Sequence, residues 1–149
     1  YAKRLNDKSW RVALESAEAL SFLETPVAVK SVAMMLSIPF LEIIGVEALG
    51  RSSSPEVDPL IVGMLAHGDF QVVAAALAQI DIRKITVPRE TIQNLLTSEN
   101  PAIRLEGLVW LSNHPAPEDR PHVAFLLRDP NPAVKKQAKL YAQALDERE

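Results

Sequence analysis

The sequence predicts an all-α protein, built as a right-handed α-solenoid of about four and a half to five stacked helix pairs. Three observations lead to this prediction. An apolar helical stripe recurs about every 31 residues, small or apolar side chains follow it at helical spacing, and helix-capping residues precede it. The 149 residues are enough for one domain with a sizeable core, so we expect a single repeat domain over residues 1–149.

Four similar segments set the period of the repeat. They are residues 5–12, 65–72, 96–103 and 127–134, and each ends on a β-branched residue that opens an apolar stripe. With Leu41 in the remaining gap, the stripe starts at positions 12, 41, 72, 103 and 134, so the spacing is 29 once and 31 three times. A period of this length is typical of stacked helix pairs. The repeats are expected at residues 1–23, 24–52, 53–84, 85–114 and 115–149.

The second helix of each pair begins at such a stripe. In four of the five repeats a capping residue stands three residues earlier, and its side-chain oxygen can accept from the free N–H groups of the first turn; the second repeat has Ile38 there and lacks the cap. The capping residues are Ser9, Asp69, Asn100 and Asn131. Small or apolar side chains recur at +4, +7 and +8 from the stripe residue, and a small residue at +4 lets a neighbouring helix approach closely. The +4 residues are Ser16, Gly45, Ala76, Gly107 and Ala138.

The first helix of each pair is expected to open at a proline and to end in a pair of Leu or Met residues. The prolines are Pro26, Pro55, Pro88 and Pro117, and the pairs are Met34-Met35, Met64-Leu65, Leu95-Leu96 and Leu126-Leu127. Gly50 stands where a left-handed C-terminal cap is expected. Between Ile80 and Pro88 the usual Gly or Ser is missing, so we expect an irregular turn there. The pattern predicts a fragment of a first helix followed by nine full helices.

These motifs resemble the HEAT-repeat family, specifically the short HEAT-like repeats of the phycobilisome-lyase type. The Pro-Glu-x-x-Pro-Leu-Ile opening of that repeat is matched by residues 55–61, its Asp-Pro turn by residues 129–135, and its Ala-Leu-Gly ending by residues 47–51. The resemblance covers essentially the whole chain and implies the α-solenoid fold. It does not imply one function, because this repeat serves many unrelated roles.

Composition narrows the function classes. The net charge of −3 gives no electrostatic support to general nucleic-acid binding, and no apolar run approaches the roughly 20 residues that cross a bilayer. The absence of cysteine excludes disulfides and thiol chemistry but leaves the compartment open, with a cytoplasmic location favoured. The chain begins without Met, and we interpret it as a piece of a longer protein.

No catalytic constellation emerges from the sequence. His67, His114 and His122 stand at no metal-ligand spacing, and no Ser-His-Asp arrangement or Gly-rich phosphate loop is present. We therefore predict no catalytic residues, no metal and no cofactor, and a protein that is not an enzyme.

One surface is more apolar than the fold requires. A helical wheel places positions +2, +5 and +6 of the second helices away from the core, and in the middle repeats these positions are apolar. If exposed, they form a stripe that could receive a helix or peptide from another protein, or another part of the same polypeptide. The predicted partner-binding residues are Ile43, Val46, Ala74, Leu77, Leu105, Leu108, Val109 and Leu140. The competing interpretation is that neighbouring helices cover some of them.

The leading function from sequence is therefore a non-enzymatic protein–protein interaction scaffold or regulatory domain. A nucleic-acid-binding module would use Trp10, Arg104 and the terminal lysines Lys135, Lys136 and Lys139. A tetrapyrrole lyase or chaperone-like role is the third alternative, and it rests on the repeat resemblance alone. A solenoid that acts only as a spacer needs no site. The oligomeric state is not predicted.

Overall fold

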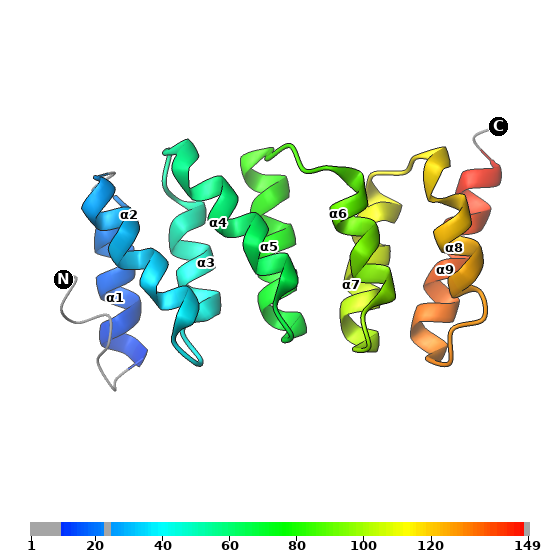
Figure 1. The fold of residues 1–149 in the computed structure, drawn as a ribbon, viewed down its shortest axis with the longest axis horizontal. Helices are drawn as coiled ribbons and strands as arrows, with labels where there is room; N and C mark the ends of the chain where they lie inside the picture. Colours follow the sequence, from blue (N-terminus) through cyan, green and yellow to red (C-terminus); the bar gives the residue numbers. More distant parts are fainter. Residues whose placement is uncertain (1–9, 23–24, 148–149) are drawn as a thin grey trace. The chain divides into compact units, whose positions relative to one another are not determined.

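A computed structural model describes residues 10–22 and 25–147 (Figure 1), and this part of the chain holds nine α-helices and no strand. The all-α prediction is confirmed. The nine helices are α1 Trp10–Ser21, α2 Pro26–Ala33, α3 Glu42–Gly50, α4 Asp58–Gly63, α5 Phe70–Arg83, α6 Arg89–Gln93, α7 Pro101–Asn113, α8 Arg120–Leu126 and α9 Pro132–Asp146. Short 3₁₀ turns extend several of them, at Met34–Ser37, Pro55–Val57, Met64–Ala66, Asn94–Thr97 and Pro117–Asp119.

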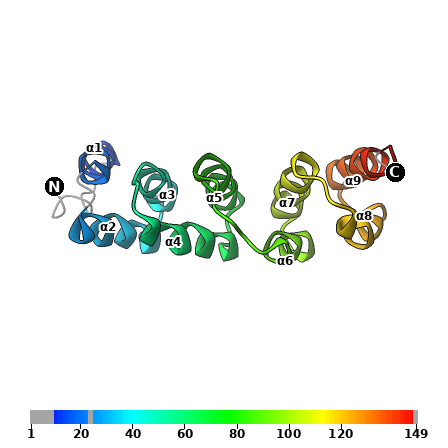
Figure 2. The same ribbon diagram turned by 90° about the horizontal axis from the view of Figure 1, so that it is seen from above.

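The helices form two compact units. Of the described residues, the first unit contains those up to 67 together with 71–86, and so holds α1 to α4 and α5 from Gln71 onward. The second contains residues 68–70 and those from 87 onward, with α6 to α9. In the first unit, α1, α3 and α5 lie in one layer and α2 and α4 in the other (Figure 2). In the second unit, α7 and α9 form one layer and α6 and α8 the other. Each unit is thus two helices deep, with its core between the layers.

The predicted helix starts are confirmed at Asn100, at Asn131 and at the four prolines that open the first helices. Asn100 accepts a hydrogen bond from the backbone N–H of Ala102, and Asn131 accepts from those of Ala133 and Val134. The first helices begin at or beside the expected prolines: α2 starts at Pro26, Pro88 caps α6, and Pro55 and Pro117 open 3₁₀ turns that lead into α4 and α8. The capping prediction for Ser9 lies outside the described residues.

The predicted core positions are buried or half-buried in every second helix. In α9, for example, Val134 and Ala138 are fully buried and Tyr141 is 1% exposed. The small +4 residues allow the close approach that their size predicts. A Cβ on Gly107 would lie 2.8 Å from the Cβ of Leu95, and one on Gly45 would lie 3.1 Å from the Cβ of Met35. Glycine at these two positions therefore sets the distance between the paired helices.

Two turns differ from the sequence prediction. Gly50 has no positive φ and is simply the last residue of α3, and its missing side chain instead makes room for Gln79 of α5. The left-handed cap lies at Lys84, whose φ is 57°. There the N–H of Lys84 donates to the carbonyl of Asp81 and that of Ile85 to the carbonyl of Ile80, which is the Schellman arrangement. The segment after Ile80 is therefore a regular helix stop that uses lysine where glycine is usual.

We expect Lys84→Gly to raise the free energy of unfolding by about 0.5–1 kcal/mol, because glycine enters the left-handed region without the steric conflict of a Cβ. Urea denaturation followed by circular dichroism measures the change. Lys30, an exposed residue within α2, serves as the matched control. Glycine there should lower stability by about 1 kcal/mol, since its helical φ needs no glycine. A loss of stability in both variants would contradict the left-handed cap.

Candidate functional site

The structure divides the eight predicted partner-binding residues by helix position. The +5 residues Val46, Leu77 and Leu108 are buried, at 0%, 4% and 0% exposure. The expectation that they face outward is therefore wrong. Ile43, Ala74 and Leu105, at +2, are half-buried. Only the +6 residues Val109 and Leu140 are exposed among the eight, at 37% and 51%.

The burial of Leu108 is explained by the two sides on which its helix is covered. Leu108 lies on α7, which contacts both α6 in the opposite layer and α9 in its own layer. Turning 100° per residue, position +5 lies about 100° from +4 and about 60° from +8, so it borders the core rather than opposing it. A helix packed within a layer therefore buries +5 as well as the stripe.

In the second unit the remaining apolar positions form one candidate site, which we call the α7–α9 face. It consists of Leu105 and Val109 on α7 and Lys136, Lys139 and Leu140 on α9. The two helices are in contact, and positions +2 and +6 lie on the same side of each. Lys136 and Lys139 are exposed beside Leu140. The face thus combines apolar side chains with two cationic side chains.

In the first unit the corresponding positions have a different character. Ile43 and Ala74 are half-buried, and their +6 neighbours Glu47 and Ala78 are exposed. An acidic residue and a methyl group therefore stand where the α7–α9 face has Val109 and Leu140. This part of the predicted stripe offers little apolar surface for a partner.

Arg104, which sequence analysis considered for nucleic-acid contacts, is engaged within the second unit. Its Nε and Nη2 donate to the two carboxylate oxygens of Asp129 at 2.8 and 2.9 Å, and Nη1 donates to the carbonyls of Ser98 and Glu99. The hydrogen bond from Arg104 holds the pKa of Asp129 below its usual value. The guanidinium of Arg104 therefore links the turns before α7 and α9, and it is not available to bind a phosphate group.

A second charged group, which the sequence did not predict, joins three segments of the same unit: α6, the turn at 116–119 and α9. The carboxylate of Asp119 is fully buried and accepts from Arg89 Nε at 2.8 Å, from Gln93 Nε2 at 2.8 Å and from the hydroxyl of Tyr141. The Tyr141 hydroxyl also accepts from the N–H of Ala116 at 3.3 Å. We call these four side chains the Asp119 network.

The Asp119 network is arranged to keep its carboxylate charged. Burial pushes the pKa of Asp119 upward, but the hydrogen bonds from Arg89, Tyr141 and Gln93 outweigh it, so the pKa lies below its usual value. Burial and the hydrogen bond to Asp119 raise the pKa of Tyr141 to about 12. Because the group is closed to solvent at Asp119 and Tyr141, we assign it a structural role.

In the part of the chain that the structure describes, no three His, Asp or Glu side chains gather as a metal site requires. His114 stacks on the ring of Trp110, with 4.0 Å between ring centroids. Trp10 begins α1, and its side chain lies outside the description.

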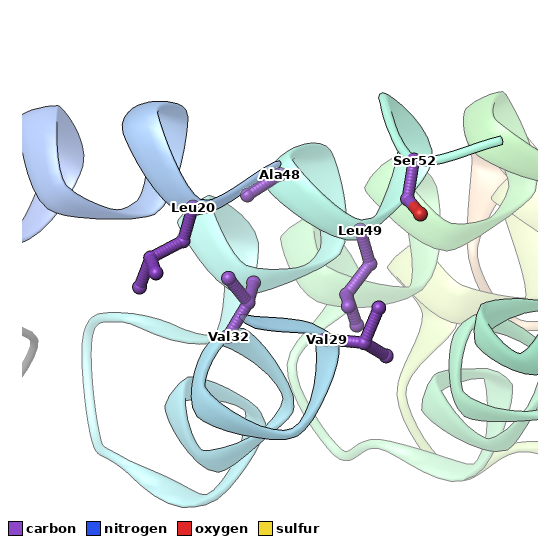
Figure 3. A pocket seen from close by; sticks show the side chains of 6 residues that line it. All are labelled: Leu20, Val29, Val32, Ala48, Leu49 and Ser52. Atoms are coloured by element: carbon purple, nitrogen blue, oxygen red, sulfur yellow. The ribbon is translucent and has the colours of Figure 1, made fainter. Parts of the chain in front are cut away.

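A small cavity lies between α1, α2 and α3. Figure 3 shows the six residues around it, which are Leu20, Val29, Val32, Ala48, Leu49 and Ser52. Its volume is about 10 Å³, which is at the lower limit for a single water molecule. We therefore interpret it as a packing defect rather than a ligand site.

No protein-family model matches the sequence, and no curated protein matches it either. Within the described residues, no helix is both long enough and apolar enough to cross a lipid bilayer. The assignment of function therefore depends on the geometry of the α7–α9 face.

Proposed function

We propose that this protein is a HEAT-like α-solenoid that acts as a non-enzymatic interaction module and binds another protein through the α7–α9 face. The observation that carries the proposal is the pair of exposed apolar side chains, Val109 and Leu140, beside two exposed lysines on adjacent helices. Helix pairs that recur about every 31 residues support the repeat architecture.

The chemistry of the face indicates the kind of segment that it binds. Apolar anchors at equivalent positions of two adjacent helices are suited to an amphipathic helix laid across them. Lys136 and Lys139 stand on the Leu140 side of the face, so acidic residues of the partner would meet them there. The proposed ligand is thus a protein helix or peptide with an apolar edge and one acidic end.

Nucleic-acid binding is the less favoured alternative. Of the cations that it would use, Arg104 is already bound to Asp129 through two hydrogen bonds. Lys135, Lys136 and Lys139 remain, but three lysines on one helix, two of them beside apolar side chains, provide little of the phosphate neutralisation on which such binding depends.

We expect the double variant Val109→Asp/Leu140→Asp to lose capture of protein partners while it keeps the wild-type helical content. The two side chains are already in contact with water, so carboxylates there cost little stability but remove the apolar anchors and oppose an acidic ligand. Affinity purification from an extract of the source cells, compared by mass spectrometry between wild type and variant, measures the loss. Each candidate partner is then tested as a purified protein.

Ile82 provides the matched control, because it is an apolar side chain of the first unit with 68% exposure. Ile82→Asp introduces the same charge elsewhere and should capture the same proteins as the wild type. If the double variant and the wild type retain identical sets, the α7–α9 face is not the docking surface. If Ile82→Asp loses the same proteins, capture depends on net charge rather than on this face.

A further inference from the structure

The contact between Arg104 and Asp129 joins successive helix pairs in the second unit. Arg104 stands on α7, holds the carbonyls of Ser98 and Glu99 in the turn before that helix, and receives the carboxylate of Asp129 from the turn before α9. One helix pair thus contributes the cation of this contact, Arg104, and the turn of the next helix pair contributes the aspartate, Asp129.

The next pair has an equivalent place. Lys135 lies 31 residues after Arg104, and the turn before α9 corresponds by the same shift to residues 98–99. Beside this turn the structure contains an open pocket of about 480 Å³. Its lining residues are Ala124, Phe125, Leu127, Arg128, Asp129 and Pro130, and we call it the α8-end pocket.

The apolar lining of this pocket is unusually accessible. Phe125 is 75% exposed. Leu127 is half-buried, whereas Leu96, its counterpart 31 residues earlier, is 2% exposed. Apolar surface therefore remains exposed at the Leu-Leu end of α8, whereas the equivalent surface after α6, at Leu96, is buried.

The charges around the pocket favour an anion. Arg128 lines it and is exposed. The carboxylate of Asp129 is 6% exposed and is bound by Arg104 and by the N–H of Asn131, so little of its charge remains uncompensated. Lys135 is close enough to lower the pKa of Asp129. One cation, Arg128, thus lines the pocket, and a second, Lys135, acts on the neutralised carboxylate of Asp129 at its edge.

We propose that the α8-end pocket binds an acidic turn of another protein, in which a leucine is followed two residues later by an aspartate. The leucine would contact Phe125 and Leu127, and the aspartate would meet Arg128 and Lys135, as Asp129 itself meets Arg104. This site is separate from the α7–α9 face and does not depend on the function proposed there.

Titration of ¹⁵N-labelled protein with a short peptide tests the proposal. The probe is acetyl-Leu-Leu-Ala-Asp-Pro-Asn-Pro-amide, which copies residues 126–132 with alanine in place of the arginine. At low salt we expect amide shifts in residues 124–130 and at Lys135, with a Kd on the order of 0.1–1 mM. Arg128→Gln and Lys135→Gln should each weaken binding roughly fivefold to tenfold, and Lys30→Gln, an exposed lysine of the first unit, should leave it unchanged.

A second peptide with asparagine in place of the aspartate controls for apolar contact alone and should bind about tenfold more weakly. Equal binding of the two peptides overturns the proposal. So does the absence of amide shifts up to a peptide concentration of about 2 mM. Amide shifts that are confined to α7 and α9 would also overturn it. Light scattering of the protein alone is measured in parallel. Self-association that perturbs the same amides would assign the pocket to a second copy of the chain and would also overturn the proposal.

Discussion

Asp119→Ala is expected to lower the free energy of unfolding by about 3–5 kcal/mol, the loss typical of removing one partner from a buried charge network. The substitution removes the common acceptor of Arg89, Gln93 and Tyr141, which come from α6 and α9. The Tyr141 hydroxyl and the Gln93 amide would lose their partner inside the second unit. Urea denaturation followed by circular dichroism, together with amide exchange of α6 and α9, measures the effect.

Two further variants separate the buried network from surface charge. Asp146 pairs with Arg120 at 2.6 Å, but its side chain is 70% exposed, so Asp146→Ala should cost at most about 1 kcal/mol. Tyr141→Phe removes the two hydrogen bonds of the hydroxyl, to Asp119 and from Ala116, and should cost about 1–3 kcal/mol. Equal losses for Asp119→Ala and Asp146→Ala would contradict the assigned role.

The pH dependence gives an independent check of the same role. Because the pKa of Asp119 is lower in the folded state than in the unfolded state, its contribution is fully present above the unfolded pKa. It is lost as the pH falls through the folded value. The stability gap between wild type and Asp119→Ala should therefore be constant near neutral pH and shrink in acid.

Local signals of the sequence predicted local structure well. Asn100 and Asn131 cap α7 and α9 because a short polar side chain before a helix needs only the N–H groups two or three residues away. Gly45 and Gly107 allow close helix approach for a similarly direct reason. The α8-end pocket could also have been found, because Phe125 is exposed near the end of α8 and Arg128 is exposed in the turn directly after it.

The Asp119 network was beyond sequence analysis. Arg89 and Asp119 are 30 residues apart, and Tyr141 is 22 residues beyond Asp119. Glu118-Asp119 looks like an ordinary acidic start of a helix, which the macrodipole favours. Only the packed unit reveals that one of the two carboxylates points inward and is fully buried. Pairing between segments this far apart leaves no mark in the local pattern.

The error at position +5 came from treating each second helix as covered on one side. Four buried residues occupy this position in α1, α3, α5 and α7, namely Ala17, Val46, Leu77 and Leu108, while Lys139 occupies it in α9 and is exposed. The residue types at +5 could have predicted this burial. Four helices have a small or branched apolar residue there, which is typical of a buried position, and the fifth has a lysine, which is typical of an exposed one. A helical wheel places position +5 on the outer side only if the neighbouring helices of the same layer are left out of account.

Leu108→Asp follows from this corrected assignment and should be among the most damaging substitutions in the second unit. The side chain is fully buried on α7, which packs against α9, so aspartate would place a carboxylate without a partner between helices. We expect a loss of about 4 kcal/mol or more, or failure of α6 to α9 to fold. Circular dichroism and urea denaturation detect either outcome.

Val109→Asp is the matched control, one residue further along the same helix. Its side chain is 37% exposed, so a carboxylate there reaches water and should cost no more than about 1 kcal/mol. The contrast between adjacent residues tests the burial boundary of α7, because net charge changes equally in both variants and the difference in helix propensity between leucine and valine is below about 0.7 kcal/mol. If Leu108→Asp instead folds with wild-type stability, position +5 faces solvent. Leu108 would then belong to the α7–α9 face together with Leu105 and Val109, and the docking surface would be wider than the one proposed.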